Sequence, residues 1–121
     1  MNLIRLCSDA AGESHFEQVD LKLTLKEFAP PAAPLHISEP HSAKAFLLLQ
    51  LPVGWIGKMH VSPKRQIMFC LSGSIKITSS TNDERIIDAG MGLLMEDTTG
   101  KGHISEVIST VPVTQVIVQR E

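Results

Sequence analysis

The stretch GKMHVSPKRQIMFCLSG, from Gly57 to Gly73, decides how the rest of this sequence is interpreted. His60 lies in a short extended segment, and Pro63 interrupts that segment because proline has no N–H to give to a strand ladder. Gln66 then opens an apolar run that ends in turn-forming residues. A bent polar strand with a histidine, followed by an apolar strand, is typical of a small β-barrel that places ligand-binding side chains at its opening.

The remainder of the chain predicts an all-β fold. From Gln18 to Phe28 apolar and polar residues alternate, which predicts a half-buried strand rather than a helix. The segment Ala43–Leu51 is apolar on both faces, so we expect both of its faces to be covered. Turn residues such as Ser80–Asp83 separate further short runs. We therefore expect about ten short antiparallel strands in a sandwich or barrel.

A chain of 121 residues has room for one hydrophobic core, so we expect a single domain over residues 1–121. Within it, residues 1–34 should hold the N-terminal strands and a proline-rich segment, Ala29–Pro34. That segment should be extended and wrapped over the surface. Residues 35–121 should form the barrel core.

The composition of the chain indicates which binding partners and which cellular location to expect for the protein. The net charge of −2 gives no reason to expect nucleic acid, and the longest apolar run is far too short to cross a bilayer. The N-terminus has no pattern of a signal peptide. The two cysteines, Cys7 and Cys70, are interpreted as reduced thiols of a cytoplasmic protein.

Two spacings resemble the motifs of the cupin superfamily. Motif 1 of that family reads Gly, five residues, His-x-His, three or four residues, Glu, six residues, Gly. Here Gly54, His60 and Gly73 match the first Gly, the first His and the last Gly, while Ser62 stands in place of the second His and Gln66 in place of the Glu. Motif 2 resembles the run from Gly92 to His103, with Thr98 where the family usually has Pro. The resemblance covers the whole chain and is to small, single-domain RmlC-like cupins with a degenerate metal motif. It implies a double-stranded β-helix, the jelly-roll barrel of that family.

The resemblance also implies a metal site that is only partly kept. Two of the four usual ligands remain, His60 and His103, and Gln66 would supply an amide oxygen in place of the usual carboxylate. One divalent metal (Fe, Mn, Ni or Zn) is one interpretation. Because a neutral amide leaves more metal charge uncompensated, the affinity should be low. In the alternative interpretation the two histidines hydrogen-bond each other, water or a ligand inside the barrel.

Glu96 and Asp97 form a second pair of interest before His103. Adjacent side chains of an extended chain point to opposite faces, so at most one of the two can face the cavity. One interpretation makes that carboxylate a general base paired with His103, and we assign it to Glu96, so that the catalytic candidates are His60, His103 and Glu96. In the other interpretation both carboxylates cap the loop Thr98–Gly102 through its N–H groups.

Five further residues are candidates for contacts with a ligand: Trp55, Ser62, Arg65, Gln66 and Met68. Arg65 could hold an anionic group, but a basic pair after a proline is also typical of a solvated bend. Met68 and Trp55 could equally be packing residues of the barrel.

Two functions therefore stay open. One is an enzyme that acts on a small molecule with or without a metal. The other is a non-catalytic binding, sensing or accessory module with the same pocket. Both imply a small-molecule ligand, no nucleic acid and no membrane, and the strand Ala43–Leu51 further predicts a homodimer.

Overall fold

The computed structural model describes residues 1–120, and in these residues it has twelve strands and no helix. The strands are β1 (Asn2–Ser8), β2 (Ser14–Asp20), β3 (Thr24–Lys26), β4 (Leu35–Ile37), β5 (Ala45–Leu51), β6 (Ile56–His60), β7 (Gln66–Ser72), β8 (Ser74–Ser79), β9 (Glu84–Asp88), β10 (Gly92–Glu96), β11 (His103–Val107) and β12 (Val113–Gln119). The all-β prediction is confirmed. No helix within residues 1–120 has the length and apolarity needed to cross a membrane.

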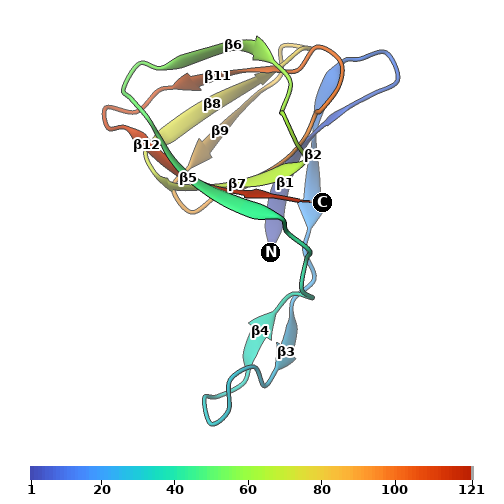
Figure 1. Ribbon diagram of the computed structural model, residues 1–121, viewed down its shortest axis with the longest axis vertical. Coiled ribbons are helices and arrows are strands. Elements are labelled where there is room, and N and C mark those ends of the chain that lie inside the picture. The colour runs from blue at the N-terminus through green and yellow to red at the C-terminus, as the bar shows by residue number, and fades with distance from the viewer. Residues whose placement is uncertain (121) are drawn as a thin grey trace.

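Ten of these strands form two facing sheets of a jelly-roll barrel (Figure 1). The six-stranded sheet has the order β2-β1-β10-β7-β12-β5, and the four-stranded sheet has the order β6-β11-β8-β9. Along the strands every second side chain points between the sheets. These inward side chains form one core, with Leu6, Met68, Leu93 and Ile117 from the larger sheet and Ile75, Ile77 and Val107 from the smaller.

The N-terminal strands belong to the barrel, which corrects the expected division at residue 34. β1 pairs with β10 in parallel, so the sheet is not entirely antiparallel, and β2 pairs antiparallel with β1. The strand predicted from Gln18 to Phe28 is also broken, because β2 runs out of partner where β1 begins. Its last ladder residue, Asp20, lies opposite Asn2, and Leu21 N–H bonds the carbonyl of Met1 at 2.8 Å.

The proline-rich segment does not wrap over the barrel. It forms the end of a two-stranded hairpin, β3–β4, which projects away from the barrel as an arm (Figure 1). Every residue from 22 to 36 is exposed. The prediction of an extended surface wrap is therefore wrong, because the prolines lie at a turn between two short paired strands.

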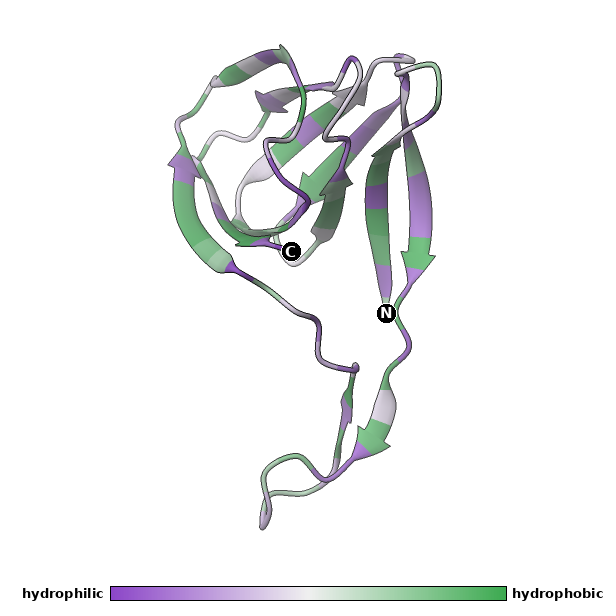
Figure 2. Cartoon of the chain, turned by 45° about the vertical axis from the view of Figure 1, so that its right-hand side comes forward, coloured by the Kyte–Doolittle hydropathy of each residue, from purple (hydrophilic) through white to green (hydrophobic). Residues whose placement is uncertain are grey.

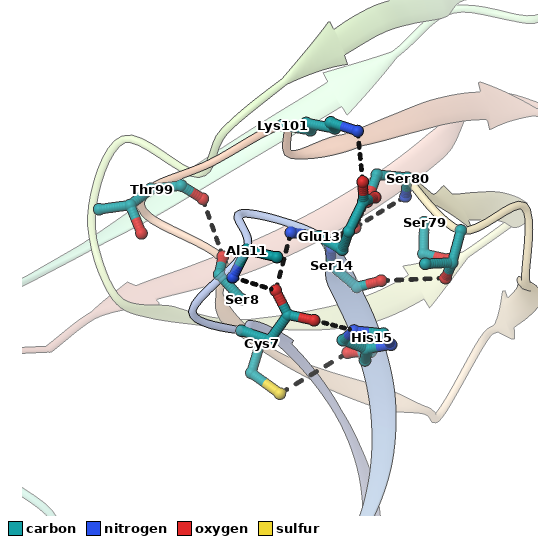
Figure 3. A network of polar contacts seen from close by, with 12 residues as sticks. Cys7, Ser8, Ala11, Glu13, Ser14, His15, Ser79, Ser80, Thr99 and Lys101 are labelled. Carbon is teal, nitrogen blue, oxygen red and sulfur yellow. Dashed lines mark hydrogen bonds and ion pairs between the residues drawn. The ribbon is translucent and has the colours of Figure 1, made fainter.

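A polar network fixes the loop that leads into β11 (Figure 3). Ser14 Oγ donates to the carbonyl of Gly102 at 2.7 Å, Ser8 Oγ donates to the carbonyl of Thr99 at 2.8 Å, and Lys101 pairs with Glu13. These bonds join the β1–β2 turn to residues 99–102. The start of β11, and with it His103, is therefore held by the turn of the N-terminal hairpin.

Candidate functional site

A cavity of about 240 Å³ lies between the two sheets. Its wall is mostly apolar, with Leu49, Leu51, Trp55, Met68, Ile75, Ile77, Met95 and Ile117. Five polar side chains interrupt this wall: His60, Gln66, His103, Ser105 and Gln115. An apolar pocket with a few converging polar groups is the usual form of a small-molecule site.

His103 is the most buried polar group of this cavity, with no solvent-exposed surface. It is the first residue of β11, and the alternation of that strand places its side chain on the inner face of the sheet with Ser105 and Val107. Its Nδ1 lies 2.5 Å from Oδ2 of Asp97, which is also fully buried. Its Nε2 is buried and has no hydrogen-bond partner among the described residues. A buried polar atom left without a partner costs free energy, so Nε2 is an atom that a ligand can satisfy.

Asp97 fixes the state of the His103 ring. Ser62 Oγ donates to Asp97 Oδ1 at 2.7 Å, and Ser62 N–H donates to the Asp97 carbonyl at 3.1 Å. An ionised carboxylate only accepts hydrogen bonds, so Nδ1 of His103 must carry the hydrogen that Oδ2 accepts. In the neutral ring the lone pair is then on Nε2.

His60 lies directly opposite His103 at the end of β6, and the ring centroids are 4.6 Å apart. Its Nδ1 is 2.6 Å from the carbonyl oxygen of Lys58. Since a carbonyl only accepts, this nitrogen also carries the hydrogen, and Nε2 has the lone pair. The two predicted histidines therefore line one cavity, each with its Nδ1 engaged.

Three more predicted residues line the same cavity. Gln66 and Met68 both point inward because they alternate along β7. The Gln66 amide has one weak contact, with Met95 Sδ at 3.8 Å. Trp55 lies beside Gly57, where any Cβ would overlap the indole, so this glycine lets the ring lie against β6.

Glu96 and Arg65 do not line the cavity, and their assignment to it is corrected. Met95 points inward in β10, so the next residue, Glu96, points to the outer face of the sheet. There it bonds Arg5 Nε at 2.7 Å and Arg65 Nε at 2.8 Å. Burial acts to raise the pKa of the Glu96 carboxyl, but the hydrogen bonds and charges of Arg65 and Arg5 outweigh it and hold that pKa below its ordinary value.

Ser62 was predicted to contact a ligand and Asp97 was not, but in the structure Asp97 is the residue that bonds His103. Ser62 does not line the cavity, and its side chain donates a hydrogen bond to Asp97, so it could act on a ligand through that carboxylate. The alternation rule allowed one inward carboxylate, and the inward one is Asp97. The interpretation that both cap the loop Thr98–Gly102 is wrong, because their oxygens bond Ser62, His103 and the two arginines instead.

Comparison with known structures identifies the fold. No protein-family model matches the chain, and no curated protein is similar to it in sequence. The Cnp3 cupin domain of Schizosaccharomyces pombe matches with a TM-score of 0.51 and 14% identity, over 89% of this chain and 73% of that domain. The chain has a cupin fold. The predicted double-stranded β-helix is thereby confirmed, while the narrower resemblance to RmlC-like cupins stays a prediction.

Two other structures are similar. A conserved protein of unknown function from Streptococcus pyogenes matches with a TM-score of 0.50 and 19% identity, over 69% of this chain and 71% of that one. The iron(II) form of HppE in complex with substrate matches with a TM-score of 0.41 and 12% identity, over 61% of this chain and 44% of that one.

The donor set of this cupin cavity does not suit a divalent metal well. Among residues 1–120 no three or more His, Cys, Asp or Glu side chains gather as a metal site. Both oxygens of Asp97 are already bonded, and Glu96 is on the far side of the sheet. Two imidazoles and the neutral amide of Gln66 therefore remain, without an anionic ligand to balance the metal charge.

Proposed function

We propose that this protein binds a small, largely apolar molecule in the barrel cavity through a hydrogen bond to Nε2 of His103. The observation that carries this proposal is the buried Asp97–His103 pair, whose free Nε2 lines an apolar wall. The preferred ligand has a hydroxyl or similar donor on an apolar body. Gln66, Ser105 and Gln115 give further polar contacts that would orient it.

A second candidate is an enzyme that moves a proton. One observation favours it: an imidazole that is oriented by a buried carboxylate is the arrangement that general bases use. Here His103 would take the acidic hydrogen of the ligand while Asp97 stabilises the imidazolium that forms. Incorporation of deuterium at a carbon of the ligand in D2O would separate this activity from binding alone.

One feature supports the alternative in which a bound metal assists the reaction. Both histidines have Nδ1 bonded to an oxygen, which leaves each Nε2 available, as in metal-binding histidines. Iron, manganese, nickel or zinc would then be held by His60, His103 and Gln66. The missing anionic ligand makes this the weaker proposal. A cytoplasmic location also stays a prediction.

The test uses two probes that differ by one hydroxyl, p-cresol and toluene. We expect calorimetry on metal-free protein to show p-cresol binding about tenfold more tightly, because only p-cresol can satisfy Nε2 of His103. In the double variant Asp97→Asn/His103→Leu, which leaves no buried unpaired carboxylate, this preference should disappear. Equal affinity of the two probes for the wild-type protein would contradict the proposal.

A further inference from the structure

The outer face of the six-stranded sheet is apolar across four strands. The strand registers place Phe46, Val118, Ile67 and Leu94 in one row, and Leu48, Val116 and Phe69 in the next. Adjacent strands lie about 4.8 Å apart, so the first row is roughly 15 Å long. Phe46 and Leu48 are each 69% exposed. Soluble monomers rarely leave such a continuous apolar surface in water.

The face is hollowed as well as apolar. A groove of about 440 Å³ lies over it; its apolar wall includes Leu3, Val19, Ile67, Phe69 and Leu94, and Arg5, Glu96 and Arg120 are among its polar side chains. Leu21, Ser38 and His41 also line it, where the chain leaves and re-enters the barrel. Beyond Leu94 the first row continues into the ion pair of Arg5 with Glu17. An apolar centre with a charged border is the anatomy of a protein–protein interface.

The arm is the second unpartnered surface of the same chain. It consists of residues 21–44 around β3 and β4, and it carries Leu25 and Phe28, which are 60% and 65% exposed, and Leu35. A two-stranded hairpin alone is marginally stable in water. Figure 2 shows the arm apart from the barrel with hydrophobic segments along it, and β5 hydrophobic along most of its length. This hairpin therefore requires packing that its own barrel does not supply.

We propose that two copies of this chain form a two-fold dimer in which the arm of each copy lies on the outer sheet face of the other. The apolar side chains of the arm, Leu25, Phe28 and Leu35, would cover the face around Phe69 and Leu48. In a two-fold dimer this contact forms twice: the arm of the first copy lies on the face of the second, and the arm of the second lies on the face of the first. This proposal concerns a face outside the barrel cavity and is independent of the proposed function.

A second copy is the occupant that the areas favour. Eight large apolar side chains are involved, four on the arm and four on the face: Leu23, Leu25, Phe28, Leu35, Phe46, Leu48, Phe69 and Leu71. Each of these side chains has about 200 Å² of surface, and about half of it is exposed. Together they provide on the order of 800 Å² of apolar surface that a partner could bury. That is the area which one partner gives to a standard stable interface. One chain thus carries both halves of such a contact.

The test is the mass in sedimentation equilibrium at micromolar concentration. We expect twice the 13.2 kDa of one chain. Phe28→Asp on the arm and Leu48→Asp on the face should each raise the dissociation constant about 100-fold or more. Leu25→Asp is a second arm variant in case one of these does not fold, as judged by thermal unfolding. Ile86→Asp is the matched control, since Ile86 is 48% exposed but lies on β9 of the other sheet. It should leave the dimer intact.

Mixing the two variants tests the pairing of arm with face. The mixed dimer has one unaltered arm on one unaltered face, so Phe28→Asp and Leu48→Asp proteins should associate with each other more tightly than either does with itself. A wild-type mass of one chain would overturn the proposal. So would a dimer that the arm variants leave unchanged, or equal loss with Ile86→Asp. Failure of these tests would not affect the binding of p-cresol in the cavity.

Discussion

At the scale of single residues, the Asp97 carboxylate decides which nitrogen of His103 is an acceptor. In Asp97→Asn, the amide can donate to Nδ1, and the ring hydrogen then moves to Nε2. We expect the affinity for p-cresol to fall up to about tenfold, because the phenol must then accept from Nε2–H through its weakly accepting oxygen instead of donating to the lone pair, while toluene binding stays the same. Ser62→Ala is the control, because it removes a partner of Asp97 but keeps the carboxylate. A smaller loss in Asp97→Asn than in Ser62→Ala would contradict this role, as measured by calorimetry.

We predict that the side chain at position 66 sets the affinity of the cavity for a metal. Gln66→Glu supplies the anionic ligand that His60 and His103 lack, so Zn²⁺ or Mn²⁺ should bind measurably more tightly than to the wild type. Gln115→Glu is a matched control on the same cavity wall, at a position outside the metal set that we predict. Calorimetry with unchanged metal affinity in Gln66→Glu would show that the three side chains do not converge on one point.

Glu96 has a structural effect that depends on pH. Its pKa is held below the ordinary value, so its contribution to stability is fully present above about pH 4.5 and is lost as the pH falls through the lowered pKa. Glu96→Gln should cost about 1–3 kcal/mol at pH 7 and should make stability fall less steeply below about pH 4.5. The control Glu84→Gln alters a carboxylate 3.9 Å from Lys76 that is 56% exposed, and should cost under about 0.5 kcal/mol. Urea unfolding at several pH values measures both, and parallel pH profiles of wild type and Glu96→Gln would refute the assignment.

Much of the site could be predicted from the sequence, because its residues follow the spacing of the motifs. His60, Gln66 and His103 occupy motif positions and line the cavity with Trp55 and Met68. The carboxylate partner could not be placed, since β10 is apolar on both faces and the sequence alone does not show whether Leu94 or Met95 points inward; Met95 does, so Asp97 does too. Ser62 could have pointed to Asp97, because a buried carboxylate needs hydrogen-bond donors and this serine supplies one.

At the scale of elements, β6 and β11 bring the two histidines together, and Gly102 makes their approach possible. Its φ is +81°, and a Cβ at this position would overlap the backbone of His60. Gly102→Ala should therefore destabilise the fold by roughly 3 kcal/mol or more and move His103 away from His60. Gly54 has the same φ of +81° with open space around it, so Gly54→Ala should cost only about 1–2 kcal/mol. Equal losses in thermal unfolding would show that the close approach is unimportant.

Element boundaries were harder to predict than element type. Alternation identified a strand within residues 18–28, but pairing ended it, because β1 offers no partner beyond Met1. The apolar character of Ala43–Leu51 indicated cover on both faces, yet in one chain β5 is the edge strand next to β12. Where a strand ends and whether its faces are covered depend on which segments pair in space, and a local sequence pattern does not contain that information.

At the scale of the whole molecule, the cavity lies between the two facing sheets of the cupin fold, and the N-terminal hairpin bonds the loop that leads into β11. Ser14 Oγ, from β2, donates to the carbonyl of Gly102, the residue directly before His103. The position of His103 thus depends on contacts between residues that are 88 positions apart in the chain. Fold class was predictable from local periodicity, whereas this long-range support and the projecting arm were not.

The most direct test of the central claim is the ¹⁵N NMR spectrum of the His103 ring, with and without p-cresol, at pH 7.5 in metal-free protein. We predict a protonated Nδ1 and a lone pair on Nε2 in the free protein, and an upfield shift of the Nε2 resonance when p-cresol donates its hydroxyl hydrogen. Toluene should leave that resonance in place. A hydrogen on Nε2 in the free protein, or an Nε2 resonance that p-cresol does not move, would contradict it.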